Sequence, residues 1–184
     1  MSGQRIVIRD YREGDKDHVN RIAVRAFEQY QAIYEDWPGF RARLENMSGI
    51  AGTGELIVGE REGVLAGAVA YVGPGKPKAD FFEPQWPIMR MLVVAPEARG
   101  NGIARALAEE CLARARRDGA EVFALHTSPI MEVALPMYLR MGFRRLRTAP
   151  LIHGVDYDVY VLSLDAGERR ESPDPAVFRL RVED

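Results

Sequence analysis

The stretch LVVAPEARGNGIARAL, residues 92–107, decides the fold. Its first residues complete a buried-type strand over Ile88–Val94, and a turn over residues 96–101 leads into a helix predicted over residues 102–117. Another strand is predicted over residues 121–128. A strand, a glycine loop, a helix and a strand have the right length for one crossover connection between two parallel strands.

The loop between this strand and this helix can bind an anion. It contains, in order, Arg99, Gly100, Asn101, Gly102, Ile103, Ala104 and Arg105. The first N–H groups of the helix and the positive end of its dipole converge there. Gly100 and Gly102 lack a Cβ, so phosphate oxygens can approach the main chain. Arg99 and Arg105 can add positive charge.

Two common nucleotide sites do not fit this loop. It lacks the lysine and the hydroxyl residue that a P-loop places after its glycines, and it lacks the three-glycine spacing of a dinucleotide fold. Glycine pairs in tight turns are also more often structural than phosphate-binding. The loop alone therefore does not decide between a structural turn and a phosphate site.

The rest of the chain supplies further strands and helices. Before the loop, the pattern predicts a strand around Ile6 and Ile8, helices over residues 19–26 and 37–47, and a hairpin of residues 56–60 and Val64–Val72. After the strand over residues 121–128, it predicts a helix over residues 130–141, a strand from Phe143 and a last strand over residues 157–164. The Gly- and Pro-rich residues 73–87 form a loop that is either a functional lid or a mobile connection. We expect one domain over residues 1–164 and a polar tail over residues 165–184, whose alternating apolar residues permit an edge strand.

The composition narrows the class of protein. A chain of 184 residues suits one α/β domain, and 25 basic against 27 acidic residues give no positive patch for nucleic acid. The longest apolar run, Val64–Val72, is too short to span a membrane, and the N-terminus lacks a secretory pattern, so a cytoplasmic protein is expected. Cys111, the only cysteine, sits among helix-spaced apolar residues and is expected in the core.

In its central third the chain resembles the GCN5-related N-acetyltransferases (GNAT). The signature loop of that family reads Arg or Gln, two residues, Gly, one residue, and Gly or Ala, here Arg99, Gly102 and Ala104. A second family block appears as Ala134, Tyr138, Gly142 and Phe143. The two blocks stand in the family's order and separation, and the resemblance covers roughly residues 5–164.

The resemblance implies a fold class and a co-substrate. The implied fold class is α/β, with a mixed, mostly antiparallel and splayed central sheet flanked by helices. The sheet would open beside Ile88–Val94 and leave main-chain groups free for the pantetheine arm of acetyl-CoA. Leu92, Val93 and Val94 would then line this arm, and residues 99–105 would bind the pyrophosphate.

The resemblance also places the general acid of the family at Tyr138. Attack of an amine on a thioester needs a neutral amine, a polarised carbonyl and a proton for the departing thiolate. A phenol with a pKa near ~10 is reasonably matched to protonating an alkyl thiolate. Without the resemblance, simple packing on a short helix is the favoured interpretation of Tyr138. Pro136 lies two residues earlier, where it occupies the first turn of the helix or kinks it.

No motif identifies the base that accepts the amine proton. The candidates are His126, Glu83, Glu35, Asp36 and a chain of water molecules. Glu35 and Asp36 lie in an aromatic linker that can face the substrate. For His126, a hydrogen-bonded structural role is the more common one. Arg90 binds a substrate carboxylate or pairs with an acid of the fold, and the two roles are equally expected. The histidines and Cys111 lack ligand-like spacing, so no metal site is predicted.

Together these features predict an N-acetyltransferase that moves acetyl from acetyl-CoA directly to an amine of a small molecule or a peptide. We expect a monomer or a homodimer without membrane or nucleic-acid partners. The alternatives are a transferase for longer acyl groups or for protein N-termini and lysines, and a non-catalytic acyl-CoA-binding or regulatory module. The sequence does not name the acceptor.

Overall fold

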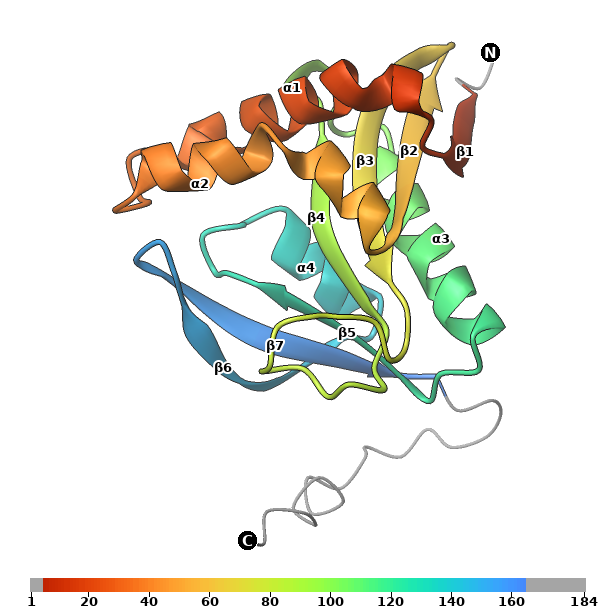
Figure 1. Cartoon of the computed structure of the whole chain (residues 1–184), viewed down its shortest axis with the longest axis vertical. Helices are drawn as coiled ribbons and strands as arrows, with labels where there is room; N and C mark the ends of the chain where they lie inside the picture. Colours follow the sequence, from red (N-terminus) through yellow and green to blue (C-terminus); the bar gives the residue numbers. More distant parts are fainter. Residues whose placement is uncertain (1–4, 165–184) are drawn as a thin grey trace, which may run out of the picture.

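A seven-stranded sheet forms the centre of the protein (Figure 1). The computed structural model describes residues 5–164, and the expected tail strand lies outside them. The strands lie in the order β1 (Ile6–Asp10), β2 (Glu55–Arg61), β3 (Val64–Val72), β4 (Ile88–Val94), β5 (Val122–Thr127), β7 (Val155–Ser163) and β6 (Arg144–Ile152). All neighbours are antiparallel except β4 and β5, which are parallel. The predicted mixed, mostly antiparallel sheet is confirmed.

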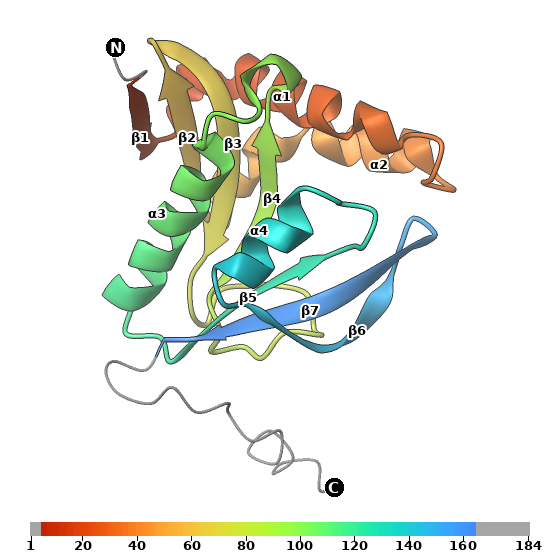
Figure 2. The same ribbon diagram turned by 180° about the vertical axis from the view of Figure 1, so that it is seen from behind.

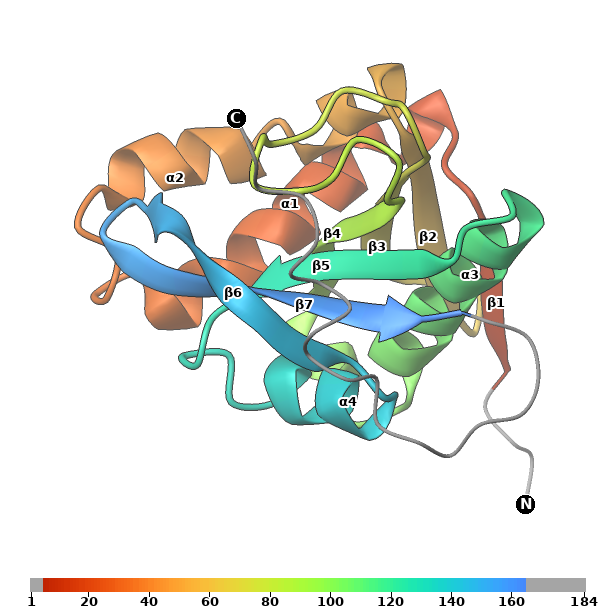
Figure 3. The same ribbon diagram turned by 90° about the horizontal axis from the view of Figure 1, so that it is seen from below.

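The sheet opens between β4 and β5. Their pairing is confined to Ile88 with Ala124 and Met89 with Leu125, whereas β5 pairs with β7 along its whole length. Strands β5, β7 and β6 lead away from β4 as the second half of the sheet (Figure 3). Among the described residues, the C-terminal half of β4 therefore has a strand partner only in β3, and the predicted splay is confirmed.

Helices cover both faces of the sheet (Figures 1 and 2). Helices α1 (Lys16–Phe27) and α2 (Trp37–Leu44) lie on one face, and α3 (Ile103–Arg117) and α4 (Ala134–Arg140) lie on the other. The apolar side chains of α1 and α3 recur at helical spacing and are buried against the strands. Cys111 is one of these core residues, as expected, and burial raises the pKa of its thiol.

Two tight turns set the hairpins. Glu62 and Gly63 connect β2 to β3 with φ values of 54° and 79°, and His153 and Gly154 connect β6 to β7 with φ values of 46° and 83°. Left-handed central residues are typical of two-residue hairpin turns, because their twist matches that of the strands. The tightness of the second turn lets β7 begin at Val155, earlier than the predicted residue 157.

A bulge interrupts β4 at Met91. Ala70 of β3 lies opposite Arg90 and Ala68 lies opposite Val93, so β4 holds one residue more than β3 in this interval. Met91 has a φ of 55°. Since paired residues share a face of the sheet, the bulge puts Arg90 and Val93 on the same face. That face is the one covered by α1 and α2, because the opposite face, at Gly67, meets Ile103 of α3.

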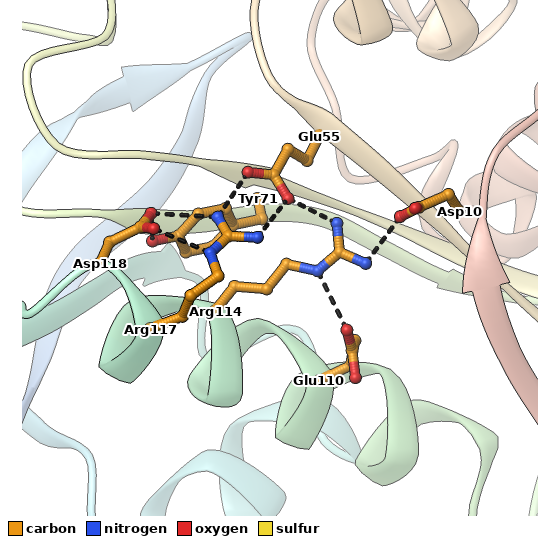
Figure 4. A network of polar contacts seen from close by, with 7 residues as sticks. All are labelled: Asp10, Glu55, Tyr71, Glu110, Arg114, Arg117 and Asp118. Atoms are coloured by element: carbon orange, nitrogen blue, oxygen red, sulfur yellow. Dashed lines mark hydrogen bonds and ion pairs between the residues drawn. The ribbon is translucent and has the colours of Figure 1, made fainter.

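Arginines of α3 tie the helix to the first strands through a polar network (Figure 4). Arg114 contacts three carboxylates, at 2.7 Å from Asp10, 2.6 Å from Glu55 and 3.0 Å from Glu110. Arg117 reaches Glu55 at 2.7 Å and Asp118 at 2.8 Å. The hydroxyl of Tyr71 donates to Asp118. The network joins β1, β2, β3 and α3 on one side of the molecule.

The loop of residues 73–87 is packed rather than extended. Lys78 donates from Nζ to the carbonyl oxygens of Gly73, Lys76 and Pro84, and Phe82 and Trp86 are buried. Burial of the Lys78 ammonium lowers its pKa. Within residues 5–164, no helix is long and apolar enough to cross a membrane.

Candidate functional site

A cavity of about 540 Å³ occupies the opening of the sheet. Its walls come from α1, α2, β4, β5, α4 and the hairpin of β6 and β7. Residues 89–92 line it from β4, residues 125–127 line it from β5, and Tyr138 lines it from α4. The cavity ends at Leu92, so Val93, Val94 and the glycine loop lie beyond it along the chain.

The open edge of β4 offers main-chain groups. Ala95 donates its N–H to Ala66 of β3, and Val94 lies opposite Gly67. In an antiparallel ladder, hydrogen-bonded and non-hydrogen-bonded pairs alternate, so Val94 directs its N–H and C=O away from β3, toward the opening. The same alternation applies to Leu92. Val93, in contrast, is buried in the core with its side chain 1% exposed.

The glycine loop turns sharply into the N-terminus of α3. Gly100 and Gly102 have φ values of 75° and 81°, and Gly102 is the N-cap of α3. The first bond of the helix runs from Ala106 N to Gly102 O, so the N–H groups of Ile103, Ala104 and Arg105 precede the helical ladder. They are the donors that such a helix presents to a phosphate.

Side chains of the loop hold its shape. Asn101 donates through Nδ2 to the carbonyl oxygens of Ala98 and Arg99. Arg99 donates to the carbonyl oxygen of Ala26 at the end of α1. Arg105 pairs with Glu109 one turn along α3, at 2.8 Å. The structure thus brings the predicted loop residues together, with Arg105 engaged in an exposed ion pair.

Tyr138 lies on α4, against α3 and the cavity. Its side chain is 6% exposed, its ring packs edge-on against Phe143, and burial followed by the proximity of Cys111 raises its pKa. In the described part of the chain, no hydrogen bond to its hydroxyl is formed. Pro136 is the third residue of α4, within the first turn, where the helix has no N–H to lose. The helix is therefore not kinked ahead of Tyr138.

His126 is the one candidate base that lines the cavity. Its ring packs against Phe81, Phe82 and Tyr157, and its Nδ1 is buried without a hydrogen-bond partner among residues 5–164. The expected hydrogen-bonded role is thus absent at this nitrogen. Burial, followed by the charge of Arg90, lowers the pKa of His126 to about 4, so the imidazole is neutral at pH 7.

The other candidate bases have partners outside the cavity. Asp36 caps α2 by accepting from Gly39 N, and its Oδ2 lies 3.0 Å from His153 Nδ1. These contacts, the first foremost, lower the pKa of Asp36. Glu83 pairs with Arg147 at 3.3 Å, and the main chain of Glu35 donates to His153. None of the three carboxylates lines the cavity.

Sequence reasoning found Arg90 but missed Arg43. Both line the cavity, Arg90 from β4 and Arg43 from α2. Asn46 and Thr53, which follow α2, also line it and were not predicted. Nothing local distinguishes Arg43 from Arg41 on the same helix; only the fold brings one of them to β4. Among the described residues, no group of His, Cys, Asp and Glu side chains is arranged to hold a metal ion.

Comparisons with known proteins agree with this geometry. Residues 16–143 match the acetyltransferase (GNAT) family. The structure of yncA from Salmonella typhimurium, with its cofactor acetyl-CoA, is 20% identical with a TM-score of 0.64, covering 91% of this chain and 99% of that one. A GNAT family acetyltransferase from Brucella melitensis in complex with acetyl-CoA is 20% identical with a TM-score of 0.61, covering 92% and 94%.

A third similar structure is the ribosomal-protein-alanine N-acetyltransferase from Brucella melitensis. It is 27% identical with a TM-score of 0.63, covering 86% of this chain and 99% of that one. Among curated proteins, none matches the chain. The structural likenesses extend over almost the whole of each neighbour, so they concern the complete fold rather than one motif.

Proposed function

The chain belongs to the GNAT acetyltransferase family, and on this premise we propose that it transfers an acetyl group from acetyl-CoA to an amine. The observation that carries the proposal is the opening between β4 and β5, which holds a cavity lined by Tyr138 and leads along β4 to an anion-binding loop. Residues 1–164 act as one catalytic domain in this proposal.

The residues present fit acetyl-CoA. The N–H groups of residues 103–105 and the dipole of α3 suit a pyrophosphate, and the left-handed Gly100 and Gly102 leave room beside the main chain, since a Cβ at Gly100 would meet nothing within 4 Å. The main-chain groups of Leu92 and Val94 suit the amides of the pantetheine arm. Acetyl-CoA, when bound, supplies the thioester that the amine attacks.

Tyr138 is the proposed general acid. Its hydroxyl has no competing partner in the described chain, and its raised pKa keeps it protonated through the neutral and mildly alkaline range. It can therefore donate a proton to the departing thiolate, which needs one as the carbon–sulfur bond breaks. Transfer is direct in this proposal, because Cys111, the one thiol of the chain, is fully buried in the core.

His126 is the proposed acceptor of the amine proton, directly or through water. It is neutral at pH 7 and lies on β5 across the opening from β4. Its low pKa makes it a weak base, so a relay to solvent is a reasonable part of the proposal. The rings of Phe81 and Phe82, which do not line the cavity, pack against its imidazole.

Release of free thiol from acetyl-CoA tests the proposal. We expect thiol release that depends on an amine drawn from a panel of amino acids, polyamines and short peptides. We also expect acetyl-CoA, but not acetate, to raise the melting temperature, because it binds the folded loop and not the unfolded chain. A thermal shift without turnover would identify a binding module instead. The absence of both a thermal shift and turnover would refute the assignment of acetyl-CoA.

A further inference from the structure

Two arginines meet in the cavity from different parts of the chain. Arg90 lies on the face of β4 that α1 and α2 cover, and Arg43 belongs to α2. Both side chains line the cavity and are accessible from it. The two guanidinium groups therefore share one cavity. Desolvation, followed by the charge of Arg43, lowers the pKa of Arg90, in keeping with this arrangement.

Neither arginine has a partner within the described residues. The guanidinium groups of Arg43 and Arg90 form no hydrogen bond or ion pair with residues 5–164, although Arg41, two residues before Arg43 on the same helix, pairs with Glu45 at 2.8 Å. Unpaired like charges that approach each other are unfavourable, and an anion placed between them would remove that repulsion.

The cavity supplies no negative charge of its own. Its lining residues include no Asp and no Glu. His126 is neutral at pH 7 and so does not offset the charge. The cavity is therefore positive, which disfavours polyamines and lysine side chains as acceptors and favours an amine that carries an anion.

We propose that Arg43 and Arg90 bind the carboxylate of the acceptor, and that the acceptor is a free amino acid with an uncharged side chain. The proposal rests on the acetyl transfer proposed above and names its substrate class. A guanidinium group binds a carboxylate with two parallel hydrogen bonds, so two such groups fix the position of the amino acid. The apolar walls from Phe27, Ile50 and Met131 suit an uncharged side chain.

The size of the cavity supports a small acceptor. About 540 Å³ has to hold both the acetyl end of the coenzyme and the acceptor. Pockets of about 300–1,000 Å³ usually take one drug-sized ligand, so the space left here suits an amino acid better than a folded protein segment.

The test compares each acceptor with its uncharged counterpart. The twenty amino acids are screened for thiol release, and the best is compared with its amide, with spermidine and with a tripeptide amide that has a free amino terminus. We expect the amide to have a kcat/KM about 10- to 100-fold lower, because it keeps the amine and the side chain and loses the charge-assisted hydrogen bonds.

Substitutions then assign the preference to the two residues. Arg90→Gln and Arg43→Gln should each raise KM for the amino acid about 10- to 100-fold and leave the amide within about twofold, and Arg90→Lys should restore part of the loss. Arg41→Gln is the matched control, since Arg41 is on the same helix and pairs with Glu45 outside the cavity. It should leave the preference unchanged.

The outcomes separate this inference from the proposed activity. If the amide, spermidine or the tripeptide reacts as well as the best amino acid, or if the preference survives both glutamine variants, the inference is overturned while acetyl transfer stands. If no amine releases thiol, acetyl transfer fails, and calorimetry of amino acids with the protein and coenzyme A decides. Amino-acid binding that Arg90→Gln abolishes would support the carboxylate site, and absence of binding would refute it.

Discussion

Two pairs of arginines in this protein are arranged in opposite ways. Arg114 and Arg117 on α3 are surrounded by carboxylates of four residues (Figure 4): Asp10, Glu55, Glu110 and Asp118. Arg43 and Arg90 line a cavity whose lining residues include no carboxylate. The first pair satisfies its charge within the chain, and the second leaves its charge available.

The difference separates groups that stabilise the fold from groups available to a ligand. Removing a group that is hydrogen-bonded or ion-paired within the fold leaves its partners unpaired and lowers stability. Removing a group without partners leaves no other group unpaired. Substitutions in the α3 network should therefore change stability and spare turnover. Substitutions of Tyr138, Arg43 and Arg90 in the cavity should do the reverse.

The largest effect is expected at Tyr138. Tyr138→Phe should lower kcat about 10²- to 10⁴-fold, the usual contribution of a positioned acid, and leave acetyl-CoA affinity within a few-fold. The free energy of unfolding should stay nearly unchanged, because the lost hydroxyl has no hydrogen-bond partner in the described chain. Single-turnover kinetics measure the rate, titration calorimetry measures the acetyl-CoA affinity, and urea denaturation measures the free energy of unfolding.

Tyr34→Phe is the matched control for this variant. The hydroxyls of Tyr34 and Tyr157 lie 2.6 Å apart in a buried hydrogen bond, and Tyr34 does not line the cavity. This variant should keep full turnover and lose about 1 kcal/mol of stability. Full single-turnover activity of Tyr138→Phe would make Tyr138 a packing residue.

The next largest effect is expected in the α3 network. Arg114→Ala should lower the free energy of unfolding by about 2 to 3 kcal/mol, because the arginine is largely buried and its loss leaves three carboxylates near one another. Arg41→Ala, which breaks an exposed pair, should cost less than about 0.5 kcal/mol. Urea denaturation measures both, and kcat/KM of Arg114→Ala should stay within about twofold of wild type. A loss of turnover without a loss of stability would contradict the comparison.

His126 should make the folded state sensitive to acid. Its folded pKa of about 4 lies below the unfolded value near ~6.5, so the unfolded chain binds the proton first as the pH falls. The contribution of His126 to the free energy of unfolding is therefore fully present above about pH 6.5 and decreases toward pH 4. The decrease is about 2 kcal/mol at pH 5. His126→Gln should remove this slope between pH 8 and pH 5.

His18→Gln is the control for the acid slope. His18 is an exposed residue of α1 that does not line the cavity, and His126 has its ring contacts with Phe81, Phe82 and Tyr157 instead. Its substitution should leave the dependence of unfolding free energy on pH as in wild type. An unaltered slope in His126→Gln would show that other groups dominate acid unfolding.

The smallest effect is expected at the glycine loop. Gly102→Ala should cost about 1 kcal/mol of stability through its left-handed φ, and in addition weaken acetyl-CoA about tenfold by placing a methyl group near the phosphate. Gly63→Ala has almost the same φ, 79° against 81°, and equally open surroundings, so it should cost the same stability. Calorimetry should find normal acetyl-CoA affinity in Gly63→Ala; equal affinity in both variants would refute the phosphate site.

Much of the fold was predictable because its signals are local. The glycine loop, the helix after it, the hairpin of β2 and β3 and the short helix that carries Tyr138 each depend on neighbouring residues. The bulge at Met91 was not predictable, because a methionine with positive φ carries no sequence signal.

The candidate site was predicted only in part, because the type of a residue does not determine whether its side chain points into the cavity. Glu35, Asp36 and Glu83 are plausible bases in sequence, yet each lies outside the cavity. Arg43, in contrast, was not predicted from the sequence and yet lines the cavity, because the fold brings α2 to the same cavity as Arg90 of β4. Contacts between distant segments are fixed by the whole fold and not by any local pattern.

The bulge at Met91 has an evolutionary consequence. It divides β4 into an inner half that ends at Arg90 and an outer half of Leu92 to Val94, and each half has its own alternation of faces. In the proposed enzyme the inner half contacts the acceptor and the outer half contacts the coenzyme. Mutations can therefore diversify one half while selection preserves the other. A library for changing acceptor preference can accordingly be restricted to the inner half of β4 and the facing residues of α2, with the coenzyme half held constant.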